Sequence, residues 1–118
     1  MELSRHQVYK RTLAGTLTSR FSTAKISAGK RGLSFNITKD NIRDLWFNQH
    51  GRCALTGVPM GLTGSGWLAM SLDRIDPYKG YEVDNIQLTC WRVNDAKHKM
   101  TQHGFEAMCE AVTIVRKS

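Results

Sequence analysis

The sequence has neither a long apolar run nor paired cysteines. No stretch approaches the roughly 20 apolar residues that a membrane-spanning helix needs, and no uninterrupted apolar segment follows the basic residues near the N-terminus, as one does in a signal peptide. Its three cysteines, Cys53, Cys90 and Cys109, form no CxxC pair, which argues against a disulfide framework and against a zinc knuckle. We therefore expect a soluble, cytoplasmic protein with buried free thiols and no membrane partner.

A mixed zinc site is the remaining alternative for the cysteines. Cys53, Cys90 and Cys109 together with His98 would supply four ligands of the right type. Their spacing, however, matches no standard zinc set. A structural zinc ion is therefore not expected.

Acidic residues are nearly absent from the first quarter of the chain. Residues 1–31 hold seven Lys or Arg against Glu2 alone, a net charge of +6, whereas residues 32–118 hold ten basic and nine acidic residues, a net charge of +1. Apolar residues recur every three or four positions in the same segment, at Leu13, Leu17, Phe21, Ala24 and Ala28. This spacing predicts an amphipathic helix over residues 7–28 with its basic side exposed.

Such a concentration of cations favours a polyanionic partner, and nucleic acid is the commonest one for a cytosolic domain. The plainer alternative is a basic face that is merely solvated. A membrane-surface helix would show the same charge pattern, but here the apolar stripe is thin, Ser and Thr are frequent, and no second anchor is visible. The residues expected to contact nucleic acid are Lys10, Arg11, Arg20, Lys25, Lys30 and Arg31.

The regions around the middle of the chain give weaker signals. Residues 33–37 are expected to be extended, and Thr38 is a good N-cap for a helix over residues 39–49 that ends before Gly51. Residues 53–60 predict a tight turn. The Gly-rich stretch 61–66 lacks the lysine of a P-loop and is expected to be a surface connection.

Near the C-terminus, Thr101 can cap a further helix. In this helix, Phe105, Met108, Cys109 and Val112 recur at helical spacing. A stripe of this kind usually packs in the core, so we expect it to be buried.

Residues 71–97 combine strand, turn and helix signals with many polar side chains. We predict a strand over 71–75, a loop, a second strand over 85–90, and a helix that begins near Trp91. This order brings Asp73 next to the helix that carries Asn94. One carboxylate and one amide oxygen, completed by waters and a substrate phosphate, suit Mg²⁺. The plainer reading makes Asp73 an ion-pair residue of the loop and Asn94 a helix cap.

These residues resemble the ββα-metal motif of the HNH (His-Me finger) endonucleases, and the segments GRCALTGVPM and SLDRIDPYKGY resemble small HNH proteins of bacteriophages. The likeness is close over about 27 residues. It implies an α+β fold with a ββα-metal core at residues 71–99 and flanking helices. The chain length suits a single domain spanning 1–118, in which the basic segment 1–31 forms a helical N-terminal arm. The likeness also implies that Asp73 and Asn94 hold a divalent ion, Mg²⁺ or Mn²⁺, that Asn85 braces the loop, and that Lys97 lies one turn beyond Asn94 as a further nucleic-acid contact.

One position departs from the family pattern. Where the motif has a catalytic histidine, this chain has Arg74, whose guanidinium stays protonated and cannot act as an ordinary general base. Activation of water would then fall to His98, which lies one helical turn after Asn94, to Asp76, or to the metal itself. Arg74 would contact the phosphate and stabilise negative charge in the transition state.

The sequence therefore predicts a metal-dependent endonuclease that hydrolyses or nicks double-stranded DNA, in the host cytoplasm if a phage encodes it. A catalytically degenerate scaffold that binds DNA or inhibits a host nucleic-acid enzyme is the alternative, and Arg74 favours it. Retention of oxygen ligands at Asp73 and Asn94 favours the enzyme. An oligomer is compatible with either reading.

Overall fold

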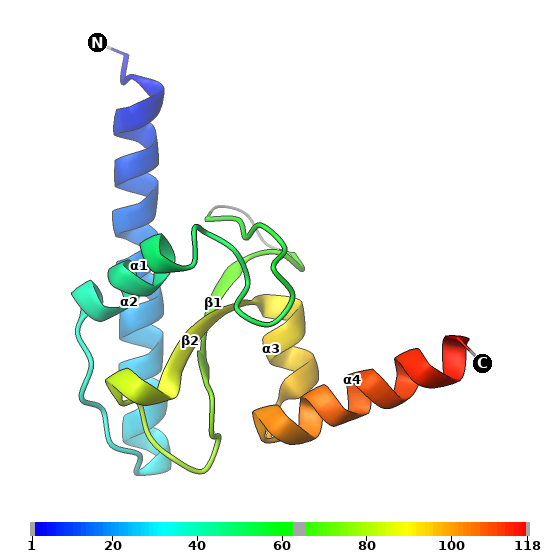
Figure 1. Cartoon of the computed structure of the whole chain (residues 1–118). Helices are drawn as coiled ribbons and strands as arrows, with labels where there is room; N and C mark the ends of the chain where they lie inside the picture. Colours follow the sequence, from blue (N-terminus) through cyan, green and yellow to red (C-terminus); the bar gives the residue numbers. More distant parts are fainter. Residues whose placement is uncertain (1, 63–65, 118) are drawn as a thin grey trace.

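The computed structural model describes residues 2–62 and 66–117. In chain order the elements are α1 (Arg5–Arg31), α2 (Lys39–Asn48), β1 (Met70–Arg74), a 3₁₀ turn (Val83–Asn85), β2 (Ile86–Cys90), α3 (Trp91–Lys97) and α4 (Gln102–Lys117). In the described residues, helices α1, α2 and α3 pack around a two-stranded antiparallel sheet and α4 projects from it, in an α+β arrangement that measures 58 × 37 × 22 Å (Figure 1). Part of the predicted Gly-rich connection, residues 63–65, lies outside the described residues.

Helix α1 is longer than the predicted 7–28 because both of its ends are capped. The Ser4 side chain accepts a hydrogen bond from the Gln7 amide and the Gln7 side chain accepts one from the Ser4 amide, which forms a capping box. At the other end Gly32 adopts φ 66°, a left-handed conformation that favours glycine, and closes the helix. The predicted apolar stripe faces the core: Leu13, Leu17, Ala24 and Ala28 are buried and Phe21 is half-buried. The first turns of α1 extend beyond the rest of the molecule (Figure 1).

Helix α2 begins where the sequence predicts, with Thr38 and Asn41 forming a second capping box. Ile42 and Trp46 are its buried residues, and the Trp46 indole nitrogen donates to the Tyr9 hydroxyl at 2.9 Å. This hydrogen bond, together with the packing of α2 on α1, makes the basic N-terminal helix an integral part of the fold and not a detachable arm.

The ββα unit contains the predicted strands with a small shift. Met70 pairs with Cys90 and Asp73 with Gln87 across the sheet. All five residues of β2 are buried, because α2 and α3 both pack against this strand. Asn85, expected at the start of the second strand, instead ends the 3₁₀ turn, since its side chain is bonded to the preceding loop. The predicted extended segment at 33–37 forms an isolated bridge between Phe35 and Tyr81.

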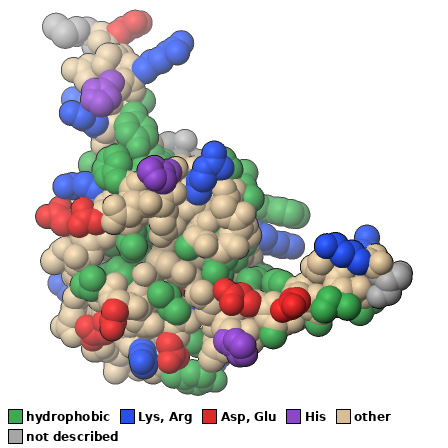
Figure 2. Space-filling model, viewed as in Figure 1, with side chains coloured by type: hydrophobic (Ala, Val, Ile, Leu, Met, Phe, Trp, Pro, Cys, Tyr) green, Lys and Arg blue, Asp and Glu red, His purple; other side chains and the backbone are tan. Residues whose placement is uncertain are grey.

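The apolar stripe of helix α4 is not buried, contrary to the expectation from the sequence. No described residue of α4 is buried, and Met108 and Val112 are 45% and 58% exposed. Phe105 is half-buried, and Gln102 bonds to Gln87 of β2, so the first turn alone meets the body while the rest of α4 projects away (Figures 1 and 2). None of the described helices is both long and apolar enough to cross a membrane.

Candidate active site

A cavity of about 650 Å³ opens between the end of α1, the end of β1 and helix α3; we call it the polar cavity. Four of the predicted catalytic and metal-binding residues line it: Asp73, Arg74, Asn94 and His98. Arg31 and Lys99 add positive charge to the lining, and Asp95 adds negative charge. Asp76 is not among the described residues that line it.

Asp73 is held from two sides within the ββα unit. Its Oδ2 atom accepts a hydrogen bond from the Gln87 amide at 2.8 Å and lies 2.9 Å from the Lys97 ammonium. Asp73 is 4% exposed and Lys97 1% exposed. Gln87 was missed as a site residue from the sequence, although its position opposite Asp73 follows from the pairing register of the two strands.

Lys97 differs from its expected place on a DNA-binding surface. Its ammonium donates to the carbonyls of Arg74 and Ile75 at 2.7 and 3.2 Å as well as to Asp73. An ammonium has three donors, and three acceptors surround this one, so the buried charge is fully satisfied. Lys97 therefore fastens α3 to the end of β1 and is not available to a phosphate.

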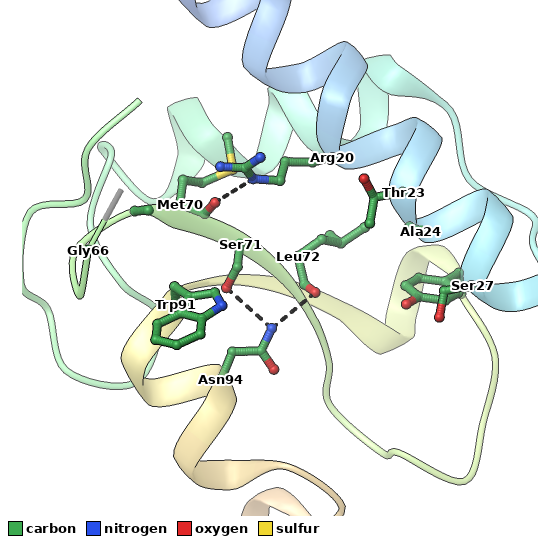
Figure 3. Close-up of a pocket in the computed structure, with 12 residues that line it drawn as sticks. Arg20, Thr23, Ala24, Ser27, Gly66, Met70, Ser71, Leu72, Trp91 and Asn94 are labelled. Carbon is green, nitrogen blue, oxygen red and sulfur yellow. Dashed lines mark hydrogen bonds between the residues drawn. The ribbon is translucent and has the colours of Figure 1, made fainter. Parts of the chain in front are cut away.

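Asn94 projects from α3 toward β1. Its amide nitrogen donates to the Ser71 hydroxyl at 3.2 Å and to the Leu72 carbonyl at 3.4 Å, so its amide oxygen points away from the strand (Figure 3). Ser71 is itself fixed, because its hydroxyl donates to the Thr89 carbonyl at 2.8 Å. The orientation of Asn94 is thus set by the sheet.

The two predicted metal ligands offer a partial oxygen donor set. Asp73 Oδ2 accepts from Lys97 and Gln87, and both Asp73 and Asn94 line the polar cavity, so Asp73 Oδ1 and the Asn94 amide oxygen are the candidate metal donors. Hydrogen bonds of this kind to one oxygen commonly orient a ligating carboxylate. A hard divalent ion that keeps several waters fits such a pair. Within the described part of the chain, no cluster of three or more His, Cys, Asp or Glu side chains could hold a metal ion.

Arg74 braces the loop that follows β1. Its Nη1 atom donates to the carbonyls of Pro77 and Lys79, the latter at 2.8 Å, and its guanidinium carbon lies 5.5 Å from the centre of the Tyr81 ring. Arg74 is nevertheless half-buried and lines the polar cavity together with Asp73.

The same loop is fixed from within by Asn85. The buried Asn85 amide donates to the carbonyls of Asp76 and Gly80 and accepts from the Asp76 amide, at 3.1, 2.9 and 2.9 Å. The Asp76 carboxylate accepts the Tyr78 amide at 2.9 Å, which makes Asp76 a turn residue here.

His98 ends α3 and faces the polar cavity. It adopts φ 45° and ψ −117°, a strained backbone conformation for a residue with a side chain. His98 is exposed, and its backbone amide donates to the backbone carbonyl of Asn94 at 2.9 Å. Strained residues often mark functional positions, and no signal in the sequence indicated this conformation.

The basic residues of α1 divide into two sets. Arg31 lines the polar cavity, and Arg20 lines a second cavity described below, where its Nε donates to the Met70 carbonyl at 2.7 Å. The others are exposed along the helix, and Figure 2 shows basic side chains on its projecting first turns. They are Arg5, Lys10, Arg11, Lys25 and Lys30.

Two of the cysteines are neighbours in the core. Cys53 and Cys90 are both buried, and burial raises the pKa of the Cys90 thiol, an effect to which nearby Cys53 adds. Cys109 is exposed on α4.

Known proteins were compared with this chain in sequence and in fold. No protein-family model matches the chain, and no curated protein matches it. Among solved structures it is similar to the rare-cutting HNH restriction endonuclease PacI, with a TM-score of 0.63 and 18% identity, over 84% of this chain and 78% of that chain. The fold is similar to that of this HNH endonuclease. The predicted α+β class with a ββα core is therefore confirmed.

Proposed function

We propose that this protein is a DNA endonuclease that hydrolyses phosphodiester bonds at the polar cavity. The observation that carries the proposal is the meeting of Asp73 and Asn94 at one cavity, on the first strand and the helix of a ββα unit. A fold similar to that of an HNH endonuclease supports it.

The charges around the polar cavity suit a phosphate. Lys97 neutralises Asp73, and the lining then has Arg31, Arg74 and Lys99 against Asp95 alone among the described residues. A net positive cavity with fixed walls concentrates polyanions at its mouth. The exposed cations of α1 extend this field along the molecule, so DNA in its double-stranded form is the proposed partner.

Asp73 and Asn94 would hold a divalent ion, Mg²⁺ or Mn²⁺, through the two free oxygens described above. When bound, such an ion supplies charge neutralisation at the scissile phosphate and at the leaving oxygen. Hydrogen bonds from Lys97 and Gln87 fix the orientation of the Asp73 carboxylate, and the contact with Ser71 fixes the orientation of the Asn94 amide. These contacts preorganise the oxygens before DNA arrives.

The chain's own residues would handle the proton and the developing charge. His98 is exposed at the cavity and accepts a proton from the attacking water, a role that Asp76 is less suited to because its carboxylate caps a turn. Arg74 donates its remaining N–H groups to a non-bridging phosphate oxygen, while Nη1 keeps the loop in place.

Nicking of supercoiled plasmid tests the proposal. The wild-type chain should nick in the presence of Mg²⁺ or Mn²⁺, and EDTA should stop it. Asn94→Ala should lose most of the nicking and keep DNA binding, whereas Asn48→Ala, at the exposed end of α2, should behave as wild type. Full nicking by Asn94→Ala would remove this residue from the site.

A second candidate is a DNA-binding scaffold without turnover. The observation that favours it is the use of both Arg74 and the Asp73 carboxylate in structural contacts. DNA binding without nicking at any divalent ion would support this second candidate over the first.

A further inference from the structure

A second cavity of about 540 Å³ continues from the polar cavity, and we call it the adjoining cavity. The residues that line both are Ser27, Leu72, Tyr81, Trp91 and Asn94. The two cavities are therefore one groove between α1 and the ββα unit, with Asn94 at their junction. Figure 3 shows the adjoining part, with Arg20 at its far end and Trp91 beside Asn94.

The lining of the adjoining cavity differs from that of the polar cavity. It is formed largely by apolar and small side chains of α1 and β1, among them Ala24, Met70 and Leu72. Arg20 is the charged residue among its described lining residues, and its guanidinium is fixed by the Met70 carbonyl. Trp91 begins α3 and is 47% exposed, so a large part of its surface is open to an incoming group.

These features together match one class of ligand. A flat aromatic surface, small hydroxyls such as Thr23 and Ser27, and a single cation suit a nucleobase with its sugar and phosphate. The volume lies within the range of about 300–1,000 Å³ that is typical of ligand pockets. In a DNA strand, a base is joined to its phosphate through one sugar. The two cavities adjoin at Asn94 and Trp91, so a phosphate in one cavity and its base in the other could belong to one nucleotide.

We propose that the adjoining cavity receives one unpaired base of the DNA strand whose phosphate lies at Asp73 and Asn94, with the base stacked on Trp91 and an adjacent phosphate at Arg20. The inference rests on the proposed function, since it places the scissile strand in the polar cavity. A base in an intact duplex is stacked between its neighbours and cannot reach Trp91 in this groove without leaving the stack. The site therefore prefers DNA that is already unpaired at one nucleotide.

Binding of three DNA probes in EDTA, where no cleavage occurs, tests the inference. The probes are a fully paired duplex, the same duplex with one unpaired nucleotide, and that second duplex with 2-aminopurine at the unpaired position. The wild-type chain should bind the unpaired probe more tightly than the paired one and should quench the fluorescence of 2-aminopurine. Equal affinity for both probes and no quenching would overturn the inference.

Substitution of Trp91 identifies the stacking surface. Trp91→Ala should weaken binding of the unpaired probe by about 5- to 150-fold, the range of aromatic stacking on one base, and should weaken binding of the paired duplex much less, because no base of that probe stacks on the ring. Trp91→Phe keeps a ring and should retain most of the preference. Trp67→Ala is the matched control, because Trp67 is 64% exposed, lies in the loop that precedes β1 and is not among the lining residues.

The outcomes separate this inference from the proposed function. Equal effects of Trp91→Ala and Trp67→Ala on both probes would overturn the stacking site while duplex binding still supports the endonuclease. Absence of binding to every probe by the wild-type chain would overturn both.

Discussion

The Lys97 ammonium lies 2.9 Å from the Asp73 carboxylate, and both side chains are almost completely buried. The pair joins α3 to the end of β1. The Lys97 ammonium also donates to the carbonyls of Arg74 and Ile75, which lead into the loop after β1. Asp73 is therefore fixed by a structural contact at the same time as it faces the polar cavity. Oδ2 accepts the hydrogen bonds from Lys97 and Gln87, and Oδ1 is the oxygen proposed to bind the metal ion.

Removal of Lys97 should strongly destabilise the fold. Lys97→Met leaves the Asp73 carboxylate buried without its partner, and loss of one member of a buried pair costs about 3–5 kcal/mol in the free energy of unfolding. Urea unfolding measures this cost. Lys99→Met, at an exposed neighbour, should change the free energy of unfolding by less than about 0.5 kcal/mol.

The double variant Lys97→Met/Asp73→Leu removes both charges and checks the cause. It should lose less stability than the sum of the two single variants, because each single variant leaves an unpaired buried charge and the double variant leaves none. Additive losses would show that Lys97 acts through packing and not through its charge.

Gly80 should not tolerate a side chain. A Cβ atom at this position would lie 2.6 Å from the Ser34 carbonyl oxygen and 2.8 Å from the Ser34 nitrogen, both of them backbone atoms. Gly80→Ala should therefore separate the loop from residues 34–36 and lower the melting temperature.

Gly15→Ala is the matched control for Gly80. A Cβ at this helical position meets no atom within 4 Å, so alanine should stabilise α1 by up to about 1 kcal/mol. A Gly80→Ala protein as stable as wild type would mean that the loop and residues 34–36 are not tightly apposed.

Neutralising the exposed cations of α1 should weaken DNA binding on every sequence. Deletion of residues 1–31 is unsuitable as a test, because Leu13, Leu17 and Ala28 belong to the core. Lys10→Gln, Lys25→Gln and Lys30→Gln combined should leave the fold intact and reduce the slope of log affinity against log salt by about 0.9 for each lost phosphate contact. Arg43→Gln and Arg52→Gln, which lie outside α1, are the controls. An unchanged slope would indicate a partner other than DNA.

The sequence predicts the elements well where a local signal sets them. Thr38 and the spacing from Leu13 to Ala28 predict α2 and α1, because caps and apolar periodicity act within a few residues. The order of strand, loop, strand and helix likewise predicts that Asp73 and Asn94 meet. Contacts between residues that are distant in the sequence leave no such local signal.

Lys97 illustrates what the sequence does not reveal. Its burial depends on the carbonyls of residues 74 and 75, and no local pattern separates a buried lysine from one on a helix surface. The α4 stripe shows the reverse case, since Met108 and Val112 have core periodicity but no element of the described chain covers them. Periodicity reports that a helix has an apolar face, and tertiary structure decides what that face meets.

Arg74 offers the sharpest test of the reaction centre. If its free N–H groups stabilise the transition state, Arg74→Ala should lower the nicking rate by about 100- to 1,000-fold, the range for one preorganised donor, with a smaller effect on DNA binding. Part of any loss could come from the loop, because Nη1 also holds the carbonyls of Pro77 and Lys79. Urea unfolding of the same variant separates the two causes.

Arg74→His restores the residue of the family motif and distinguishes the two candidate functions. Histidine has an ordinary pKa of about 6.5 and accepts a proton only when neutral, so a rate that depends on it rises as the pH increases through about 6 to 7. The proposed enzyme should lose activity in this variant, because it gives up a fixed positive charge and retains His98 as its base. A scaffold without turnover should instead gain nicking with that pH profile. Parental rates in both Arg74→His and Arg74→Ala would place Arg74 outside the reaction centre, and the assignment of Asp73 as the neighbouring metal ligand would fall with it.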